Sequence, residues 1–282
     1  MTESMMEPNP ITLVGQPVTV TLTLGDRPPF ALNFFLNPQE LTQGLMWQFL
    51  THHQLYEPAT SLLFCRYLRP GDRAVDVGAH VGYYTLLAAA LVGETGQVLA
   101  CELSWTNFQR LQYHLQINHR TNVQPVWGAI GDRCGEVSFF VNADNDGGHA
   151  LWDVGQHPFN QQSAQTPQQA TAPMRTLDAL LADLTPEGPP LRLLKIDTEG
   201  AEPLVLAGAQ ATLARWRPPV VILEVNQFGL EKLGFSQMDV RRPLHELGYT
   251  GYVLGPHPQR LAPEEVYPAA LFDMVFTTDP DF

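Results

Sequence analysis

One stretch, residues 74–92, limits the folds open to this chain more than any other. It begins with apolar and β-branched residues, breaks at Gly78 and Gly82, and continues as an apolar run over 86–92. Glycine lets a backbone turn tightly and approach a ligand, and the run after it suits a helix. The stretch predicts a buried strand, a glycine turn and a helix whose unpaired N–H groups could receive the polar part of a cofactor.

The spacing of these glycines separates two classes of nucleoside cofactor. A dinucleotide-binding turn has glycines at its first, third and sixth positions, which here are Gly78, His80 and Tyr83. This mismatch disfavours a nicotinamide-dependent oxidoreductase. The pattern that remains, an Asp76-x-Gly78-x-x-x-Gly82 turn, resembles the S-adenosylmethionine (SAM) loop of class I methyltransferases; a glycine turn without a ligand is the alternative.

Composition excludes several classes of partner. The chain has 282 residues, a formal net charge of −13 and no run of Lys or Arg, which argues against nucleic acid and against an anionic membrane surface. Its cysteines are scattered and odd in number, which is typical of a reducing compartment. Residues 1–10 are acidic and no apolar segment is long enough to span a bilayer, so we expect no signal peptide and a cytoplasmic location.

Period-two alternation marks the start of the chain. Residues 17–24 alternate Val or Leu with Thr, and 30–36 suit a second strand. We expect residues 1–55 to form a small β appendage before a catalytic domain of residues 56–282. Tyr56 and Glu57 open that domain just before a predicted helix at the carboxyl ends of the sheet, where they would line a ligand site or only cap the helix.

The next predicted strand ends in an acid, and the separation of this acid from the glycine turn along the sequence indicates a function. Glu102 lies 20 residues after Gly82, about where a strand-end carboxylate meets the two hydroxyls of a ribose. A loop at 128–132 follows the third predicted strand and contains Ile130 and Asp132. In this fold class such a loop flanks the adenine, so Asp132 would accept the adenine amine or belong to a plain turn.

A region rich in Asp, Asn and Gly, and then in Gln and Pro, follows a short predicted strand at 137–142. Residues 156–173 show neither helical nor strand periodicity, and long structureless loops are often lids. We therefore expect 142–173 to be a lid or substrate loop, with a plain linker as the alternative. His149 follows two glycines and has a side chain that titrates near neutral pH, so it would be a catalytic base or only an anchor for the loop.

The most specific segment is residues 193–209, a predicted strand that ends in acids, a glycine turn and a helix. Its Lys-Ile-Asp-Thr-Glu-Gly-Ala-Glu core, residues 195–202, strongly resembles the signature of the FkbM family of SAM-dependent methyltransferases. The resemblance covers about residues 56–228. Other marks of the family occur in the expected order: the turn at 76–85, Glu102, Thr-Leu-Asp at 176–178 and Ile-Leu-Glu-Val at 222–225.

This resemblance implies a fold, a cofactor and its contacts. The fold would be the α/β, Rossmann-like fold of class I methyltransferases, with a seven-stranded sheet, helices on both faces and an antiparallel last strand. His80 and Leu103 depart from the family, which more often has Asn and Pro there. SAM would be the cofactor, bound by Tyr56, Glu57, Asp76, Gly78, His80, Gly82, Thr85, Glu102, Leu103, Ile130, Asp132 and Asp197.

Methyl transfer requires mainly that a nucleophile is held in line and, if it is a hydroxyl, loses its proton. Polar groups follow the fourth and fifth predicted strands, and the catalytic candidates are His149, Asp197 and Glu199. Asp197, Glu224 and Asn226 could instead hold a divalent cation such as Mg²⁺, as in some related sugar O-methyltransferases. In the alternative, Asp197 and Glu199 cap the next helix and bind the methionine amine of the cofactor.

The function predicted from these motifs is SAM-dependent methylation of a hydroxyl on a small molecule, such as a sugar, polyketide, lipid or other natural product. The rival is a SAM-binding module that regulates a partner without catalysis. The intact acids at both strand ends favour the enzyme. Neither the acceptor nor the oligomeric state is specified by these motifs.

Overall fold

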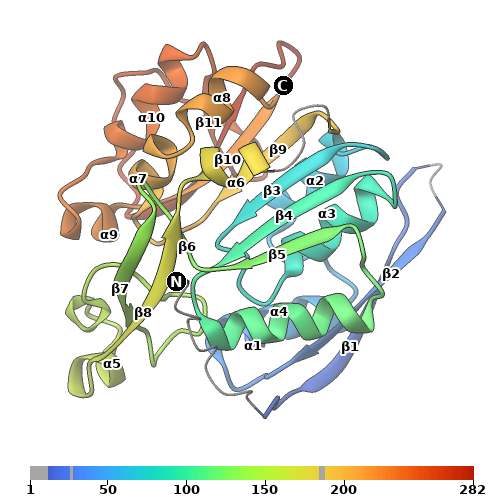
Figure 1. The fold of residues 1–282 in the computed structure, drawn as a ribbon, viewed down its shortest axis with the longest axis horizontal. Coiled ribbons are helices and arrows are strands. Elements are labelled where there is room, and N and C mark those ends of the chain that lie inside the picture. Colours follow the sequence, from blue (N-terminus) through green and yellow to red (C-terminus); the bar gives the residue numbers. More distant parts are fainter. Residues whose placement is uncertain (1–11, 26–27, 184–187) are drawn as a thin grey trace, which may run out of the picture.

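The computed structural model describes residues 12–25, 28–183 and 188–282. Its main sheet is mixed and eight-stranded (Figure 1), in the order β12 (Gln259–Arg260), β11 (Thr250–Val253), β13 (Leu271–Thr277), β10 (Val220–Asn226), β9 (Leu191–Ile196), β3 (Arg73–Val77), β4 (Gln97–Glu102) and β5 (Val123–Trp127). The strands from β10 to β5 are parallel, and β13 runs antiparallel to β10 and β11. The predicted sheet with an antiparallel last strand is confirmed, and the two-residue strand β12 adds an eighth member at one edge.

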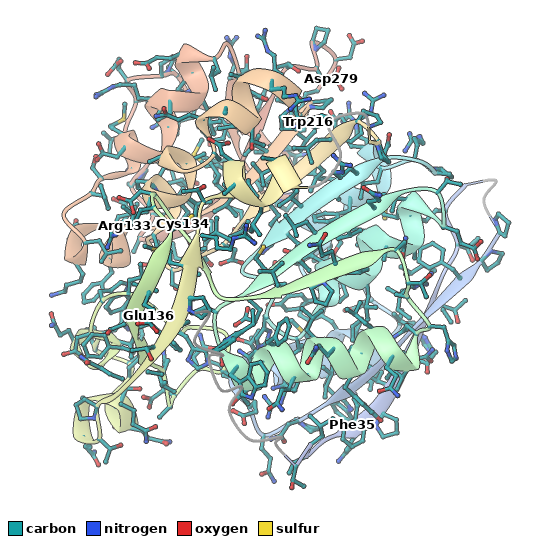
Figure 2. The ribbon with its side chains drawn as sticks, viewed as in Figure 1. Phe35, Arg133, Cys134, Glu136, Trp216 and Asp279 are labelled. Carbon is teal, nitrogen blue, oxygen red and sulfur yellow. The ribbon has the colours of Figure 1, made fainter. Side chains whose placement is uncertain are left out.

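Helices cover both faces of this sheet, and all five residues of β3 are buried as a result. One face packs against α2 (Pro58–Tyr67), α3 (Tyr83–Val92) and α4 (Trp105–Ile117). The other packs against α6 (Leu177–Asp183), α7 (Glu202–Ala207), α8 (Gln210–Trp216) and α10 (Gln237–Glu246), with α9 (Gln227–Lys232) after β10. Side chains fill the space between these layers (Figure 2). The predicted α/β fold with helices on both faces is confirmed.

An antiparallel hairpin of β1 (Gln16–Leu22) and β2 (Phe30–Leu36) carries the alternation seen in the sequence. Its inward side chains join the same apolar core as α3 and α4. His114 fixes this contact, because its Nε2 accepts the Phe35 N–H at 2.9 Å and its Nδ1–H donates to the Val81 carbonyl at 2.6 Å. Helix α1 (Leu41–Thr51), which the sequence did not predict, follows the hairpin.

A second, three-stranded sheet has the order β6 (Ala129–Ile130), β8 (Gln168–Arg175) and β7 (Gly135–Val141). Between β7 and β8 lie a short 3₁₀ helix, η1 (Val154–Gln156), and α5 (Gln161–Gln165). The expectation of irregular structure was wrong for residues 161–165, which form α5, and for residues 168–173, which belong to β8. In β8, Ala172 and Met174 are buried, Pro173 between them is half-buried, and Gln168 and Gln169 are exposed, a pattern that the Gln-rich composition hides.

The order of the strands places a crevice at the centre of the main sheet. From β3 the chain proceeds to β4 and β5 on one side, and it returns to β9 and β10 on the other. Ligands of open α/β sheets bind at such a reversal, beyond the carboxyl ends of the strands. Among the described residues, no helix is long and apolar enough to cross a membrane.

Candidate active site

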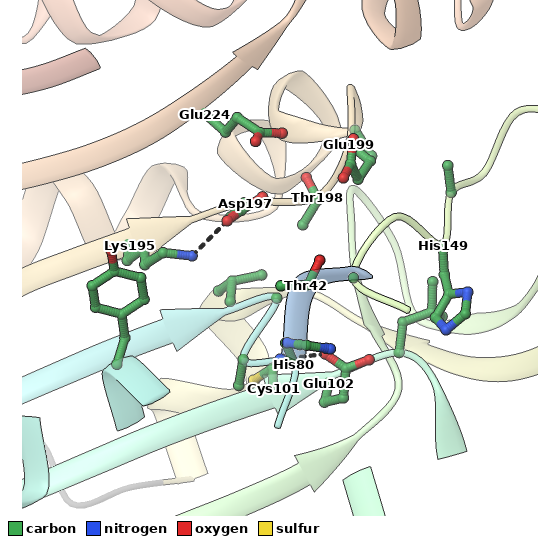
Figure 3. A pocket seen from close by; sticks show the side chains of 18 of the residues that line it. Thr42, His80, Cys101, Glu102, His149, Lys195, Asp197, Thr198, Glu199 and Glu224 are labelled. Carbon is green, nitrogen blue, oxygen red and sulfur yellow. Dashed lines mark hydrogen bonds and ion pairs between the residues drawn. The ribbon is translucent and has the colours of Figure 1, made fainter. Parts of the chain in front are cut away.

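A pocket of about 310 Å³ lies at the carboxyl ends of β3, β4, β9 and β10, within the size range of small-molecule sites (Figure 3). Of the site residues predicted from the sequence, those that line it are Tyr56, Glu57, Gly78, His80, Glu102, Leu103, Ile130, His149, Asp197, Glu199 and Glu224. Predicted residues outside the lining are Asp76, Gly82, Thr85, Asp132 and Asn226.

The glycines of the turn are required by close approaches. Gly78 has φ +78°, and a Cβ there would lie 1.8 Å from the carbonyl oxygen of Asp197. Gly82 has φ +93°, and its Cβ would lie 2.5 Å from Cδ1 of Leu111. Only glycine therefore lets the turn after β3 contact the end of β9 and the side of α4.

A hydrogen bond between Asp76 on β3 and Thr85 on α3 stabilises this turn. Both are buried, and the Thr85 hydroxyl donates to Asp76 Oδ2 at 2.6 Å. Burial raises the pKa of Asp76, which has the Lys195 ammonium nearby. These two residues hold the start of α3 in place, and we assign them no direct contact with a ligand.

Glu102 lies in the pocket wall at the end of β4. Its Oε2 accepts the His80 N–H at 2.7 Å and its Oε1 accepts the Ser104 N–H at 2.8 Å. Since an ionised carboxylate has about four acceptor positions, each oxygen retains one for a ligand hydroxyl. Burial raises the pKa of this carboxyl group, and the donors oppose that shift. The arrangement fits a ribose diol.

The His80 side chain is oriented by a buried carboxylate. Its Nε2 lies 2.9 Å from Asp146 Oδ2, and Asp146 also accepts the Thr42 N–H at 2.7 Å and the Gln43 side-chain N–H at 2.8 Å. Burial alone would raise the pKa of Asp146, but bonds from His80 and Gln43 hold it well below its usual range. With the Nε2 proton directed at Asp146, the buried Nδ1 of His80 has no partner among the described residues.

Several lining residues were missed by the sequence reasoning. Four of them come from α1: Leu41, Thr42, Leu45 and Met46. This helix carries no motif and no side-chain cap at its start, so nothing local marked it as part of the site. Lys195 was also missed, although its place in the 195–202 signature was a signal that could have found it.

Tyr56 and Glu57, which directly precede α2, also line the pocket. Glu57 has φ +42° immediately before α2, and its Oε2 accepts the Tyr84 hydroxyl at 2.6 Å. The Tyr56 ring packs edge-on against Tyr83 with ring centroids 5.4 Å apart. Burial and the nearby Glu57 raise the pKa of Tyr56, so its hydroxyl stays protonated. Both residues line the pocket rather than only capping the helix.

Lys195 and Asp197 form an ion pair at the end of β9. Lys195 Nζ lies 2.8 Å from Asp197 Oδ2, and the Tyr84 ring lies 5.0 Å from the ammonium. Burial lowers the pKa of Lys195, but Asp197 and Asp76 more than offset this and raise it. Lys195 is therefore ionised in the folded protein.

Glu199, two residues after Asp197, is held in position by contacts of its backbone and side chain. Its φ is +56°, its carbonyl accepts the Trp152 indole N–H at 2.7 Å, and its Oε2 accepts the Asn226 side-chain N–H at 2.7 Å. Strained backbone of this kind persists where the surroundings enforce it. Burial and the nearby Asp197 raise the pKa of Glu199 to about 8, which is close to the range useful for a general base.

Glu202 shapes the loop that carries Glu199. It is completely buried, and its Oε1 accepts the Thr198 N–H at 2.8 Å, the Thr198 hydroxyl at 2.9 Å and the Gly200 N–H at 3.2 Å. Burial raises the pKa of Glu202 to about 7. Its role is to position the residues of the loop.

The predicted metal site receives no support. The described residues contain no group of three or more His, Cys, Asp or Glu side chains that could hold a metal ion. Asn226, one of the three predicted ligands, accepts the Gly229 N–H with Oδ1 at 3.1 Å and donates to Glu199 with Nδ2. Its side chain therefore caps α9 and orients Glu199.

His149 lines the pocket, but its geometry opposes the predicted role as a base. Its Nδ1 accepts the Asn142 N–H at 3.0 Å, so the proton of the neutral ring lies on Nε2. Burial, with a contribution from His80, lowers the pKa of His149 to about 4. The alternative, an anchor for the loop, fits these contacts.

Ile130 and Asp132, both predicted to contact the cofactor, lie in different environments in the structure. Ile130 is buried and lines the pocket, whereas Asp132 lies outside it and its Oδ1 pairs with the Arg133 guanidinium at 3.0 Å. Arg133 is next to Cys134 in the turn before β7 (Figure 2). The structure therefore does not bring Asp132 to the position expected for a contact with adenine.

Comparison with protein families gives a match over most of the sheet. The model of the methyltransferase FkbM domain matches residues 76–250, which is more than half of the chain. The match begins at Asp76 on β3 and includes the glycine turn, Glu102 and the 195–202 signature. No curated protein matches the sequence.

Solved structures of similar shape include a methyltransferase FkbM from Methylobacillus flagellatus, 16% identical with a TM-score of 0.43; the match covers 85% of this chain and 56% of that one. The O-methyltransferase TomG from Streptomyces achromogenes, solved with SAM, is 14% identical with a TM-score of 0.44 and coverage of 80% and 82%. A precorrin-6y C5,15-methyltransferase from Geobacter metallireducens is 14% identical with a TM-score of 0.42 and coverage of 78% and 87%. These values are low, so the family match alone carries the assignment.

Proposed function

This chain belongs to the FkbM methyltransferase family, and we propose that it transfers a methyl group from SAM to a hydroxyl of a small organic molecule. One arrangement supports the proposal. A single pocket brings together the Gly78 turn after β3, Glu102 after β4 and Glu199 after β9. Groups suited to a ribose and a group suited to proton transfer therefore face the same space.

The residues fit SAM in two respects. Glu102 retains one acceptor position on each oxygen, and the Nδ1 of His80 is buried without a partner, so both would bind the ribose hydroxyls. Glu57 and the Lys195–Asp197 pair adjoin the glycine turn and would hold the amino-acid end. SAM, when bound, supplies an electrophilic methyl group on a sulfonium.

Glu199 replaces His149 as our proposed base. Its carboxylate would take the proton that the acceptor hydroxyl loses as the oxygen bonds to the methyl carbon and the carbon–sulfur bond breaks. Burial and Asp197 raise the pKa of Glu199 to about 8, so the carboxylate is a stronger base than an exposed Glu. Asn226 and Trp152 hold this residue in place.

The mouth of the pocket favours an acceptor with an apolar body. Leu41, Leu45 and Leu271 line it and are 53%, 43% and 58% exposed. Such a concentration of exposed leucines around one opening is suited to contact with apolar groups of a ligand. Within the broad class of hydroxyl acceptors, we therefore favour molecules with an apolar scaffold.

Calorimetric titration with SAM, its demethylated product SAH and NAD tests the cofactor. We expect SAM and SAH to bind and NAD to show no binding; binding of NAD alone would refute the proposal. A second assay follows SAH release and O-methyl products with a set of hydroxyl compounds. SAM binding without turnover of any compound would favour the alternative, a regulatory module.

A further inference from the structure

The described residues that line the pocket include more carboxyl groups than their one Lys can balance. Its acids beyond Glu102 are Glu57, Asp197, Glu199 and Glu224, and among the described lining residues Lys195 is the only Lys or Arg. Lys195 pairs with Asp197. Glu199 and Glu224 have no ion-pair partner in the described part of the chain.

Glu224 is the less satisfied of the two. Its Oε2 is buried and has no hydrogen-bond partner among the described residues. Burial, Asp197 and Glu199 raise its pKa well above the usual value. Figure 3 shows the carboxyl groups of Glu224, Asp197 and Glu199 gathered on one side of the pocket. A buried carboxyl group without partners costs free energy unless a ligand satisfies it.

The position of Glu224 in the sheet separates it from the cofactor turn. It lies on β10, and β9 stands between β10 and β3, which is followed by the Gly78 turn. In the proposed function, Glu57 and Asp197 hold the methionine ammonium of SAM beside the turn. Glu224 is therefore left for the other molecule in the pocket.

We infer that the acceptor carries a cationic amine close to the hydroxyl that is methylated, and that Glu224 binds this amine. The inference rests on the proposed function. An ammonium group offers three donors and a positive charge, so it would hydrogen-bond to the Glu224 carboxyl group and stabilise its ionised form. Together with the apolar mouth, this specifies an apolar amino alcohol.

Matched probes test this inference. The protein, saturated with SAH, is titrated with 2-aminocyclohexanol and cyclohexanol, and with 2-amino-2-deoxyglucose and glucose. We expect the amine of at least one pair to bind about 10- to 100-fold more tightly than its neutral partner, the range for a hydrogen bond to a charged group. Equal affinities within both pairs, or no binding by either amine, would overturn the inference.

Substitution then assigns the effect to Glu224. Glu224→Gln preserves shape and should reduce the affinity of the amine to that of its neutral partner, with SAH affinity unchanged. Glu231→Gln, which changes an exposed acid on α9, is the matched control and should have no effect. An amine preference that survives in Glu224→Gln would contradict the assignment.

Proton release distinguishes a bound amine from a structural effect. Carboxyl groups with raised pKa values should ionise when an ammonium binds, so calorimetry in buffers of different ionisation enthalpy should show protons released in the wild type and fewer in Glu224→Gln. Binding of Mg²⁺ that displaces the amine would instead identify a metal ligand and overturn the inference. Failure of SAH to bind would refute the proposed function, whereas SAH binding without amine preference would refute only this inference.

Discussion

Two ends of one pocket are built on different principles. At the ribose end, which comprises His80, Glu102 and Asp146, every carboxylate oxygen accepts at least one hydrogen bond from the protein. At the acid end, which comprises Asp197, Glu199 and Glu224, burial and mutual repulsion raise the pKa of Glu199 and Glu224. Of these three acids, only Asp197 forms an ion pair within the described part of the chain.

This difference in hydrogen bonding indicates which end of the pocket is completed by a ligand. A site that always receives the same ligand gains from groups fixed in advance, and the ribose end is fixed by donors from α1, the glycine turn and Ser104. The acid end holds Glu199 rigidly but leaves Glu224 unsatisfied. We interpret the first as the constant part of the site and the second as the part completed by the acceptor.

The largest expected effect is at the acid end. Glu199→Gln keeps an acceptor for the Asn226 N–H but removes the proposed base, so kcat should fall by about 10²- to 10⁴-fold with SAM affinity unchanged. Because the pKa of Glu199 is raised to about 8, kcat of the wild type should rise with pH and level off above about 8, and the variant should lose this limb. Steady-state kinetics from pH 6 to about 9.5 measure both. Turnover near that of the wild type would remove Glu199 from the mechanism.

Glu102→Ala tests the ribose end. It removes both ligand acceptors and should weaken SAM binding by about 1.5–3 kcal/mol, the range for hydrogen bonds to a charged group. Glu102→Gln retains one acceptor oxygen and should have a smaller effect. Calorimetry on protein shown to be folded by circular dichroism gives the values. Normal SAM affinity in Glu102→Ala would mean that the cofactor lies elsewhere.

The two ends should respond to pH in opposite directions. At and around the acid end, the folded-state pKa values of Glu199 (about 8), Glu202 (about 7) and Asp273 (about 7) exceed those of the unfolded chain, near 4. Asp273 lies on β13 opposite Glu224. The folded state therefore keeps protons that the unfolded state has released. Their contribution to stability is present below about pH 4 and is lost as pH rises through 7 to 8. The lowered pKa of Asp146 has the reverse effect, since its contribution is present above about pH 4 and is lost as pH falls.

Urea denaturation measures this contrast. Between pH 5 and 8, the free energy of unfolding should fall by about 1–3 kcal/mol more in the wild type than in Glu199→Gln. Glu231→Gln, with an exposed carboxyl group, should follow the wild type. Parallel curves for all three proteins would show that Glu199 is ionised without cost in the folded state.

The smallest expected effect is that of His149→Gln. Because the pKa of His149 is lowered to about 4 and its Nδ1 accepts a backbone N–H, the ring is neutral near pH 7 and has no free acceptor nitrogen. A Gln oxygen can accept the Asn142 N–H instead, so kcat should change little and stability by less than about 1 kcal/mol. A large drop in kcat with SAM affinity unchanged would restore His149 as a base.

Much of the fold, and many of the residues proposed to bind the cofactor, could be predicted from local sequence. Gly78 and Gly82 had to be glycine for reasons of backbone geometry, and their spacing is visible in the printed chain. Parallel strands bring their carboxyl ends to one edge, so acids after different strands were expected together before the strand order was known. Glu102, predicted from its separation from Gly82, and Glu199, predicted from the family signature, both line the pocket.

Other parts depend on contacts between distant segments. Asp146 receives its hydrogen bonds from Thr42, Gln43 and His80, and no local pattern distinguishes it from Asp144, whose carboxylate accepts the N–H groups of Gln162 and Ser163. The role of His149 similarly depends on which ring nitrogen meets a backbone N–H. Such pairings are set by tertiary packing, which composition and periodicity do not encode.

Asp146 has a consequence for exchanging segments between relatives. The segment that identifies the family, residues 76–250, contains Asp146 and His80 but leaves out α1, which supplies Thr42 and Gln43 and one wall of the pocket. A chimera that receives only residues 76–250 from this chain would contain Asp146. It would lack Thr42, Gln43 and the part of the pocket wall that α1 forms. Acceptor preference should therefore be inherited with α1 as well as with the segment that defines the family.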